Sequence, residues 1–505
     1  MSKRDLTSEL CAGIHQARAR IYEVGEVTPL QEITLDEIPN SVWVKREDLG
    51  PIKAYKWRGA FNAMACLSEE QRAAGVVAAS AGNHAQGIAI GARVLGCAAV
   101  IFMPRPTPMV KQKAVMSHGG AGVSIRLVGD SFSEAQDAAL AYAEEVVATF
   151  IPPYDSIDVM SGQGTVADEI FTSGKGPFDR VYVAVGGGGL ASAVATWLKS
   201  SWPGVKVIGV EGVDQASMSA AFKNGGPTGL DYVDLFCDGT AVSKVGELTY
   251  QICRDHLDGI ITVTNAEVAA AIKRHWDGLR IIPEPSGAMS LAGFLKDQRE
   301  GKVEHDEKVL TILCGANMDF AKVAEISRRA GIAPEEKRSL RFAIPEENGS
   351  LAQLLTDLPE AVSIIDLQYG RTADEPQRPV LTFAVSQEEE EAASEWISKQ
   401  EVEDATGDPQ VRYRVIPFSR SLFKAPLFVE IEFRERAGAL LGFMKKLSPL
   451  ASLCYFNYRY SGEQVGRAML GLDFQNSEAR EAGMAFVFNE EKDGVRSVKE
   501  VDFDP

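Results

Sequence analysis

The sequence of 505 residues predicts an α/β fold with two lobes built on parallel sheets, followed by a smaller α+β region. Apolar segments without polar alternation, such as 76–79 and 309–313, are separated by helix-like segments. Strands of this kind are buried on both faces, which is typical of parallel sheets covered by helices. Around residues 333–338 the sequence becomes charged and the alternation changes. We therefore expect a first domain at 1–332, with a small lobe at about 50–155 inserted in a large lobe.

The elements of the first domain follow from apolar runs and from the glycines and prolines that end them. A helix is expected at 7–21, before the stop at Val27-Thr28-Pro29-Leu30. The strands expected after it lie at 41–45, 76–79, 98–103, 123–128, 181–185, 205–210 and 309–313. The expected helices begin at Gly59, follow Ser80-Ala81-Gly82-Asn83-His84 as far as Leu95, and span 108–118, 132–148 and 190–199.

The region after the first domain is duplicated. A strand, a turn and a helix occur twice, about ninety residues apart, at 340–344 with 351–358 and at 427–433 with 439–447. We therefore expect two β-α-β-β modules, at 338–420 and 425–505. Neither module carries a nucleophile beside a base or a cluster of metal ligands, so we expect them to bind a ligand and not to catalyse.

Composition excludes several classes of function. A net charge of -18 and the lack of a basic stripe argue against a nucleic-acid or anionic-membrane surface. The sequence shows no signal-peptide core and no apolar run that could span a bilayer, which predicts a cytosolic protein. Seven scattered cysteines without Cys-x-x-Cys, and six histidines without a pair at helical spacing, favour reduced thiols and no metal site.

Lys56 lies between Tyr55 and Trp57, where the strand at 41–45 gives way to the helix from Gly59. A lysine held against apolar walls loses hydration, and desolvation disfavours its ammonium form, so its amine can be neutral near pH 7. A neutral amine condenses with a carbonyl, which makes Lys56 a candidate for a Schiff base. The alternative is a solvated lysine at a helix start, the more common outcome for an isolated lysine.

The strongest local signal after Lys56 is the run Gly186-Gly187-Gly188-Gly189 between a strand and a helix. Bare backbone amides at a helix N-terminus form a seat for a phosphate. A dinucleotide site competes with this interpretation, because Gly186-x-Gly188-x-x-Ala191 is followed by Glu211 at the end of the next strand. A purely structural turn is the third alternative.

Two further turns follow buried strands. The amides of Ser80-Ala81-Gly82-Asn83-His84 and the Ser80 hydroxyl could hold a carboxylate, and Asn83 could donate to an oxygen. Taken alone this pattern is weak, because turns favour the same residue types. The other turn begins at Cys314, and a buried cysteine is more often an apolar filler than a functional group.

Together these motifs resemble the pyridoxal-phosphate enzymes of the tryptophan-synthase β class, and within it the biosynthetic threonine dehydratases (threonine ammonia-lyases). The motifs that carry the resemblance occur in this order: Ala54-Tyr-Lys-Trp-Arg-Gly-Ala60, Ser80-Ala-Gly-Asn-His84, Gly186-Gly-Gly-Gly-Leu190, Phe236-Cys-Asp-Gly-Thr-Ala-Val242, Glu284-Pro-Ser-Gly-Ala288 and Cys314-Gly-Ala-Asn317. The tail segments Ile344-Pro-Glu-Glu-Asn-Gly-Ser-Leu351 and Phe433-Arg-Glu-Arg-Ala-Gly-Ala-Leu-Leu441 resemble the openings of two ACT-like regulatory modules.

The resemblance implies a role for each motif. Lys56 would bind pyridoxal 5'-phosphate as a Schiff base and then remove the α-proton of the substrate. Residues 186–189 would bind the cofactor phosphate, Asn83 the 3-oxygen of its ring, and Cys314 its pyridine nitrogen. Residues 80–84 would bind the substrate carboxylate. The implied reaction converts L-threonine into 2-oxobutanoate and ammonia, the first step of isoleucine synthesis.

Two positions depart from the family pattern. Ala54 replaces the serine that usually precedes the aromatic-lysine pair, which removes a polar contact near Lys56. Ala81 replaces the serine with which related serine racemases exchange a proton on the opposite face of the substrate. The resemblance therefore implies elimination and not racemisation.

The resemblance also implies control by an amino acid, with isoleucine as the first candidate effector and valine as the second, and a homo-oligomer, since family members are commonly tetramers. The candidate effector contacts are the turns at Asn348, Gly349 and Ser350 and at Arg436 and Gly438, whose alternative role is only to shape the fold.

Three other functions stay open at this point. The substrate could be serine or 3-hydroxyaspartate with the same cofactor. The tetraglycine turn and Glu211 could bind a nicotinamide cofactor in an oxidoreductase. The chain could also be an amino-acid-binding regulator that has lost its catalytic function.

Overall fold

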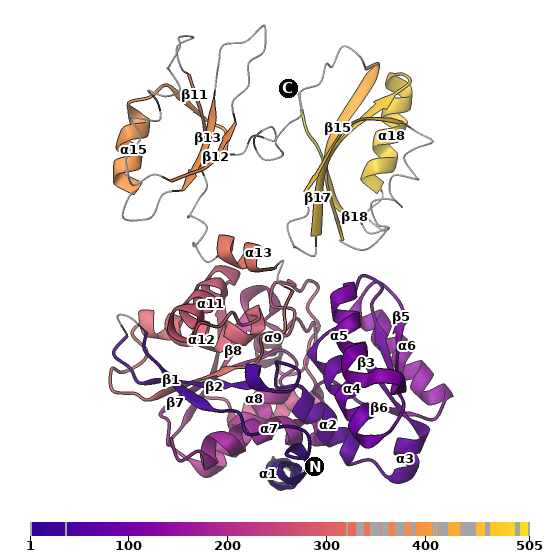
Figure 1. Cartoon of the computed structure of the whole chain (residues 1–505), viewed down its shortest axis with the longest axis vertical. Coiled ribbons are helices and arrows are strands. Elements are labelled where there is room, and N and C mark those ends of the chain that lie inside the picture. Colours follow the sequence, from indigo (N-terminus) through magenta and orange to yellow (C-terminus); the bar gives the residue numbers. More distant parts are fainter. Residues whose placement is uncertain are drawn as a thin grey trace. The chain divides into compact units, whose positions relative to one another are not determined.

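The chain consists of two compact units, Met1–Phe320 and Ala321–Pro505 (Figure 1). The computed structural model describes residues 3–35, 38–319, 322–329, 338–343, 354, 363–368, 379–384, 390–406, 408, 411, 423–434, 451–459, 465–489 and 495–502. Among these residues, no helix combines the length and the apolar character needed to cross a membrane.

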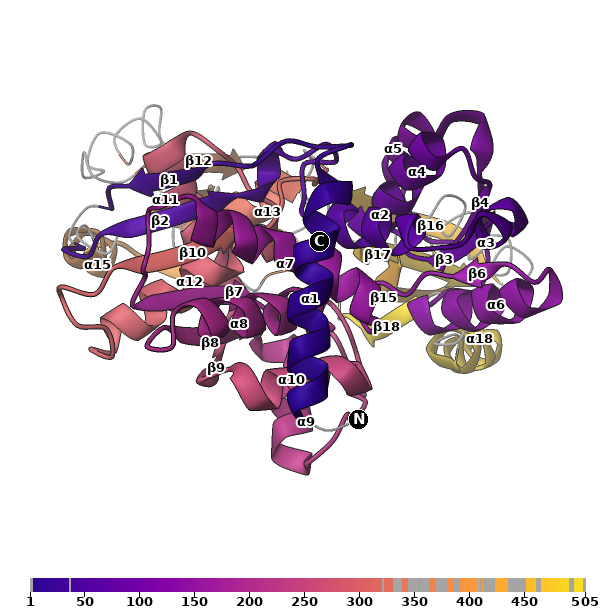
Figure 2. The ribbon, with the colours of Figure 1, turned by 90° about the horizontal axis from the view of Figure 1, so that it is seen from below.

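The large lobe of the first unit contains a six-stranded sheet in the order β1-β2-β10-β7-β8-β9 (Figure 2). Its strands are β1 (Leu30–Ile33), β2 (Val42–Arg46), β7 (Arg180–Ala184), β8 (Lys206–Gly212), β9 (Gly259–Val263) and β10 (Val309–Leu313). Only the edge strand β1 is antiparallel to its neighbour, and the other pairs are parallel. β7 and β10 are buried along their whole length, as expected for apolar strands at the centre of a covered sheet.

The small lobe is built on a four-stranded parallel sheet in the order β5-β4-β3-β6. Its strands are β3 (Val76–Ala79), β4 (Ala99–Met103), β5 (Val123–Leu127) and β6 (Thr149–Phe150). In sequence these strands fall between β2 and β7, so the small sheet is an insertion in the large one. Its core packs Val76 and Ile101 of the sheet against Ile88 and Ala89 of the helix that follows β3.

Helices surround both sheets of the first unit. They are α1 (Lys3–Ile21), α2 (Trp57–Ala65), α3 (Glu69–Ala74), α4 (Asn83–Leu95), α5 (Met109–Gly119), α6 (Phe132–Glu145), α7 (Ile157–Thr172), α8 (Gly189–Ser201), α9 (Ser217–Asn224), α10 (Glu247–His256), α11 (Asn265–Leu279) and α12 (Pro285–Arg299), with 3-10 turns η1 (Glu47–Leu49), η2 (Gly120–Gly122) and η3 (Val213–Gln215). α1 packs on α7, and α7 also packs on α2 and α8 (Figure 2). α12 packs against β7 to β10.

The strands and helices predicted for the first domain are present, with shifted ends. The first helix begins at Lys3, earlier than the expected start at residue 7. α6 ends at Glu145 and not at 148, because Val147 adopts a left-handed φ of 56° and the amide of Ala148 bonds the carbonyl of Ala143. A helix end without glycine or proline leaves no signal in the sequence.

The second unit contains two antiparallel four-stranded sheets with the same topology (Figure 1). The first sheet has the order β12-β13-β11-β14, and the second has the order β16-β17-β15-β18. In both, the order is second, third, first and fourth strand along the chain. The elements are β11 (Arg338–Phe342), β12 (Ser363–Gln368), β13 (Val380–Ala384), α15 (Glu390–Ser398), β14 (Val402–Asp404), β15 (Ala425–Arg434), β16 (Ser452–Arg459), β17 (Val465–Phe474), α18 (Ser477–Asn489) and β18 (Val495–Glu500). The first unit is followed by α13 (Lys322–Arg329).

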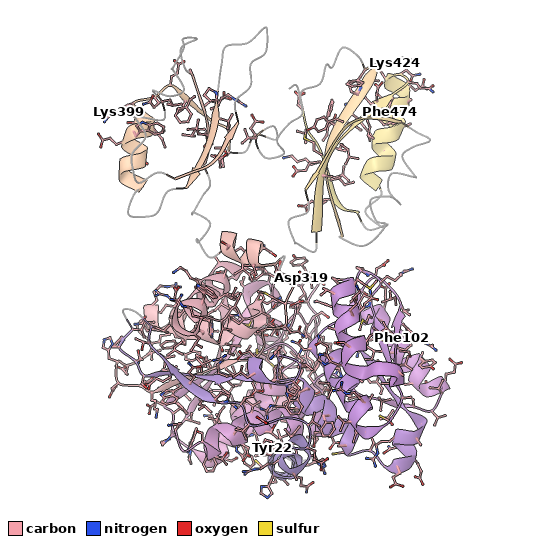
Figure 3. All side chains as sticks on the ribbon, viewed as in Figure 1. Tyr22, Phe102, Asp319, Lys399, Lys424 and Phe474 are labelled. Carbon is pink, nitrogen blue, oxygen red and sulfur yellow. The ribbon has the colours of Figure 1, made fainter. Side chains whose placement is uncertain are left out.

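The second unit confirms the duplication and the α+β class predicted from the sequence. Equivalent strands begin at Arg338 and Ala425, which matches the predicted spacing of the repeat. In the second sheet, Phe474, labelled in Figure 3, packs with Leu427 and Leu472 and with Met484 of α18. The turns that contain Asn348, Gly349, Ser350, Arg436 and Gly438, and the helix expected at 439–447, lie outside the described residues. Of the helix expected at 351–358, only Leu354 is described, and it is helical and buried.

Candidate active site

Lys56 caps the N-terminus of α2, at the junction predicted from the sequence. Its half-buried amine donates a hydrogen bond of 2.9 Å to the carbonyl of Gly239. Burial lowers the pKa of the Lys56 amine, and the carboxyl groups of Glu284 and Asp238 oppose this shift without cancelling it. The amine therefore reaches its neutral, nucleophilic form at a lower pH than a solvated lysine does.

The segment before Lys56 is held by the turn after β10. The amide of Tyr55 donates to the carbonyl of Cys314 (3.1 Å), and the amide of Ala316 donates to the carbonyl of Lys53 (2.8 Å). Between these bonds, fully buried Ala54 forms a β-bridge with Gly315. Two motifs far apart in the sequence thus form one wall of the site.

Cys314 is a buried, neutral thiol in this wall. Its sulfur donates a hydrogen bond of 3.2 Å to the carbonyl of Ser286. Burial, reinforced by the carboxyl group of Glu284, raises the pKa of the Cys314 thiol to about 12. Cys314 therefore adds no charge to the site near neutral pH.

Asn83, the first residue of α4, connects the small lobe to the large lobe. Its Nδ2 donates to Oε1 of Glu284 (2.9 Å), and its Oδ1 accepts from Nδ2 of Asn317 (2.9 Å). Both partners belong to the large lobe, and Asn83 itself is buried. These bonds fix the direction of the Asn83 amide and leave one of its two N–H groups available.

The rest of the 80–84 turn has two different environments. The Ser80 hydroxyl accepts a hydrogen bond of 3.2 Å from the amide of Gly82, while within the described structure the amides of Ala81, Asn83 and His84 donate none. These amides can therefore bind an anion at the N-terminus of α4. The His84 ring points away, because its Nε2 lies 3.1 Å from the carbonyl of Ile151 in the small lobe.

His84 is also neutral in this position. Burial lowers the pKa of the His84 imidazole to about 4, and the nearby Lys56 contributes to the shift. The His84 side chain therefore packs in the small lobe, and its backbone amide is the group that could contact a carboxylate.

The tetraglycine turn connects β7 to α8 and is closely packed from outside. A Cβ atom at Gly187 would lie 2.3 Å from the ring of Tyr154, and one at Gly186 would lie 2.9 Å from the backbone of Thr240. No described residue accepts a hydrogen bond from the amides of residues 186–189. These four consecutive amides at the start of α8 are free to donate hydrogen bonds to the oxygens of a phosphate group.

Glu211 is not available for the ribose of a dinucleotide. Its Oε1 accepts from the amide of Met218 (2.7 Å), and its Oε2 accepts from the amide (2.9 Å) and hydroxyl (2.6 Å) of Ser219. The carboxylate is fully buried at the start of α9. The dinucleotide interpretation of this segment is therefore wrong, since its acidic residue is engaged by a helix N-terminus.

Three charged residues at the site were missed by sequence reasoning. Glu284 is buried beside Asn83, and Asp238 accepts a bond of 2.5 Å from the Lys111 amine of α5, which ties the small lobe to the loop that carries Gly239. Burial, together with the charge of Asp238, raises the pKa of Glu284 to about 7. Glu284 and Asp238 lie in motifs that carry the family resemblance, but those motifs assigned no role to either carboxyl group, and Lys111 lies in no such motif. The tertiary fold brings the three residues together.

Comparison with known proteins agrees with this geometry. A family model described as "Pyridoxal-phosphate dependent enzyme" matches residues 21–315. The biosynthetic L-threonine dehydratase IlvA of Pasteurella multocida is 37% identical over 91% of this chain and 90% of its own. The corresponding enzyme of Escherichia coli is 36% identical, with coverage of 91% and 90%.

Solved structures give the same result for the first unit. The processed form of threonine deaminase isoform 2 from Solanum lycopersicum superposes with a TM-score of 0.62 at 39% identity, covering 66% of this chain and 95% of that one. Maize serine racemase superposes with a TM-score of 0.59 at 30% identity, with coverage of 62% and 95%. With relatives that match over nine-tenths of its length and a site that brings together Lys56, Asn83, Cys314 and the glycine turn, the chain belongs to the pyridoxal-phosphate dependent enzymes, and among these to the biosynthetic threonine dehydratases.

Proposed function

We propose that the chain uses pyridoxal 5'-phosphate to convert L-threonine into 2-oxobutanoate and ammonia, the first step of isoleucine biosynthesis. One observation carries the proposal: a desolvated lysine amine, a neutral thiol and four free glycine amides surround one site in a chain whose full-length relatives are threonine dehydratases. Serine and 3-hydroxyaspartate are less favoured substrates, because the relatives that match over nine-tenths of the chain are named for threonine.

The described residues fit this cofactor. We assign the phosphate to the amides of Gly186, Gly187, Gly188 and Gly189, where side chains would not fit. We assign the aldehyde carbon to the Lys56 amine, the ring 3-oxygen to the remaining N–H of Asn83, and the pyridine nitrogen to the thiol of Cys314. When bound, pyridoxal phosphate supplies an electron sink for the pair released when a Cα–H bond breaks.

The residues of the chain would bind, orient and deprotonate the substrate. The amides of Ala81, Asn83 and His84, with Ser80 and Gly82 shaping their turn, would hold the substrate carboxylate at the start of α4. Lys56, whose pKa burial lowers, would accept the α-proton. Ala81 has no group that could return a proton, which favours loss of the β-hydroxyl over racemisation.

The test is a direct one. The purified protein is expected to be yellow, with a visible band that borohydride abolishes, and to release 2-oxobutanoate from threonine with a higher kcat/KM than from serine or 3-hydroxyaspartate. Lys56→Ala should lose both the band and the turnover, while the exposed Lys113→Ala on α5 should keep both. A colourless protein that binds NADH tightly would refute the proposal.

For the second unit we propose a regulatory role, with ACT-like modules at 338–420 and 425–505. The repeated topology of the two sheets supports two equivalent binding modules. Isoleucine is the proposed effector and valine the second candidate, with Asn348, Gly349, Ser350, Arg436 and Gly438 as candidate contacts. We also propose a cytosolic homotetramer. Adding isoleucine to the threonine assay tests the effector, and light scattering tests the oligomer.

A further inference from the structure

Glu284 is a buried carboxyl group that the proposed function leaves without a role. It occupies the N-cap position of α12, but its side chain makes no capping hydrogen bond. Its backbone is fixed, since its amide donates to the carbonyl of Gly315 (3.1 Å) and its carbonyl accepts from Gly287 (2.8 Å). The side chain, only 4% exposed, turns away from the helix and toward the wall that holds Lys56.

Gly315 leaves room for this carboxyl group, and Gly239 lies in van der Waals range of it. A Cβ atom at Gly315 would lie 2.5 Å from Oε1 of Glu284, and one at Gly239 would lie 3.4 Å from the same oxygen. Gly315 bridges Ala54, and the Gly239 carbonyl accepts the hydrogen bond from the Lys56 amine. Glu284 and Lys56 therefore share the neighbour Gly239, and Gly315 connects Glu284 to Ala54, two residues before Lys56.

Glu284 also ends the chain of hydrogen bonds that runs through Asn83. Asn317 donates to Oδ1 of Asn83, and Nδ2 of Asn83 donates to Oε1 of Glu284. An ionised carboxylate only accepts hydrogen bonds, so it requires the nitrogen of the Asn83 amide on its side. The orientation of the Asn83 donor is therefore set by Glu284.

We propose that Glu284 is a positioning residue of this site, which orients the Asn83 amide and stabilises the charged form of the Lys56 nitrogen. The inference rests on the proposed function for the roles of Asn83 and Lys56. It assigns a role to the Glu284 carboxyl group of the Glu284-Pro-Ser-Gly-Ala288 motif. This group acts through Asn83 and Lys56 and touches no substrate.

The charges around Glu284 are arranged for this role. Besides Lys56, Glu284 is influenced by Asp238 and Lys111, which form an ion pair with each other, and Cys314 stays neutral. Lys56 is thus the positive charge left to balance Glu284. Burial raises the pKa of Glu284 and lowers the pKa of Lys56, and each group opposes the shift of the other.

Two variants separate the two parts of the proposal. Glu284→Gln keeps the length of the side chain and removes its charge, whereas Glu284→Asp keeps the charge and is too short to reach Asn83. In the full-length protein freed of cofactor, the pH dependence of reductive methylation at Lys56, read by mass spectrometry, reports the Lys56 pKa. Pyridoxal phosphate titration followed by visible absorbance reports the affinity.

We expect Glu284→Gln to lower the titration midpoint of Lys56 by about one pH unit or more. Glu284→Asp should keep that midpoint and weaken cofactor binding by about tenfold, the loss of one oriented hydrogen bond. Asn317→Ala, which releases the other side of the Asn83 amide, should weaken binding in the same way without moving the midpoint. Glu307→Gln, at a partly buried carboxylate paired with Arg180 at the start of β7, is the control and should change neither.

An unmoved Lys56 midpoint in Glu284→Gln would overturn the charge role, and unchanged affinity in both Glu284→Asp and Asn317→Ala would overturn the orienting role. If the parent protein binds no pyridoxal phosphate, the proposed function fails, while the Lys56 titration still decides the charge coupling. If a Glu284 variant does not fold, Asn317→Ala still tests the orientation of Asn83.

Discussion

Gly187 shows how a single missing side chain shapes the site. Its Cα faces the ring of Tyr154 so closely that an added methyl group would lie 2.3 Å from a ring carbon. We expect Gly187→Ala to displace the glycine amides and to weaken pyridoxal phosphate binding at least about tenfold, measured by visible absorbance titration. Gly204→Ala, where the added methyl meets nothing within 4 Å, is the matched control.

The clash with Tyr154 predicts a rescue as well. Replacing the ring in the double variant Gly187→Ala/Tyr154→Ala should restore most of the affinity, because the new methyl group then has room. If Gly187→Ala binds the cofactor as tightly as the parent, the glycine amides are not the phosphate site.

Glu284 makes stability depend on pH. Its folded pKa of about 7 lies above the unfolded value of 4.5, so between these values the folded state binds more protons than the unfolded state. Glu284 therefore stabilises the folded state at low pH relative to high pH. As pH rises through about 7, this contribution is lost, and the free energy of unfolding falls by on the order of 3 kcal/mol. Glu284→Gln should remove this cost.

The measurement is urea unfolding of the cofactor-free protein at pH 5 and pH 8. The stability gained by Glu284→Gln should be larger at pH 8 than at pH 5. An equal difference at both values would show that Glu284 is not an unusual acid in the folded protein.

The same residues show which parts of the site the sequence could predict. Cys314 and the tetraglycine turn directly follow the parallel strands β10 and β7, whose carboxyl ends lie at one edge of the sheet, and Lys56 caps α2, the first α-helix after the parallel strand β2, so local patterns were sufficient to place them together. Glu284, Asp238 and Lys111 could not be predicted, because their function depends on neighbours from other lobes and loops. The direction of the His84 ring was likewise decided by packing in the small lobe.

At the scale of elements, a buried network of charges fixes α2, the helix that carries Lys56. Arg58 of α2 binds Glu47 of η1 (2.8 Å) and Glu169 of α7 (2.7 Å), and Glu169 also binds Lys45 of β2 (2.5 Å), with all four side chains inaccessible to solvent. Tyr22, labelled in Figure 3, donates to Glu169 from the end of α1. The elements α2, η1, α7 and β2, and the residue that follows α1, thus meet in one network beside the helix that the candidate cofactor lysine caps.

This network predicts a large cost for Arg58→Met. The substitution leaves two buried carboxylates facing the single positive charge of Lys45, and breaking a buried ion pair from one side costs about 3–5 kcal/mol. Lys273→Met, which removes an exposed pair with Asp277 on α11, should cost less than about 1 kcal/mol. Urea unfolding of both variants gives the comparison, and equal costs would mean that the network does not hold α2.

Strands could be predicted where the sequence pattern that defines them lies within the strand and its flanking turns. The apolar strands β3, β4, β7 and β10 lie within one residue of their predicted ends, because each is an apolar run bounded by turn residues. The two-residue strand β6 is too short to leave such a signal, and it exists because Val76 and Val77 of β3 pair with it. Tertiary pairing, and not propensity, defines this edge of the small sheet.

At the scale of the whole molecule, the described residues proposed to act in catalysis all lie in the first unit. Lys56, Asn83, Glu284, Cys314 and the glycine turn precede the boundary at Phe320. The structure of the tomato enzyme covers 66% of this chain and 95% of its own. The second unit contributes two sheets, each with its own core.

Deleting residues 338–505 therefore tests how the two units divide the function. The truncated chain keeps every residue assigned to cofactor and substrate, so it should remain yellow and should release 2-oxobutanoate from threonine at a comparable kcat. An effector regulates only through a difference in its affinity for two states, and a coupling of about 1–3 kcal/mol corresponds to a 5- to 150-fold change in substrate affinity. This coupling should vanish in the truncated chain, so isoleucine should no longer change its KM.

Deleting only 425–505 is the matched comparison, since it removes one of the two repeated modules. Inhibition by isoleucine that survives the longer deletion would place the sensor in the first unit, and the repeated sheets would then need another explanation.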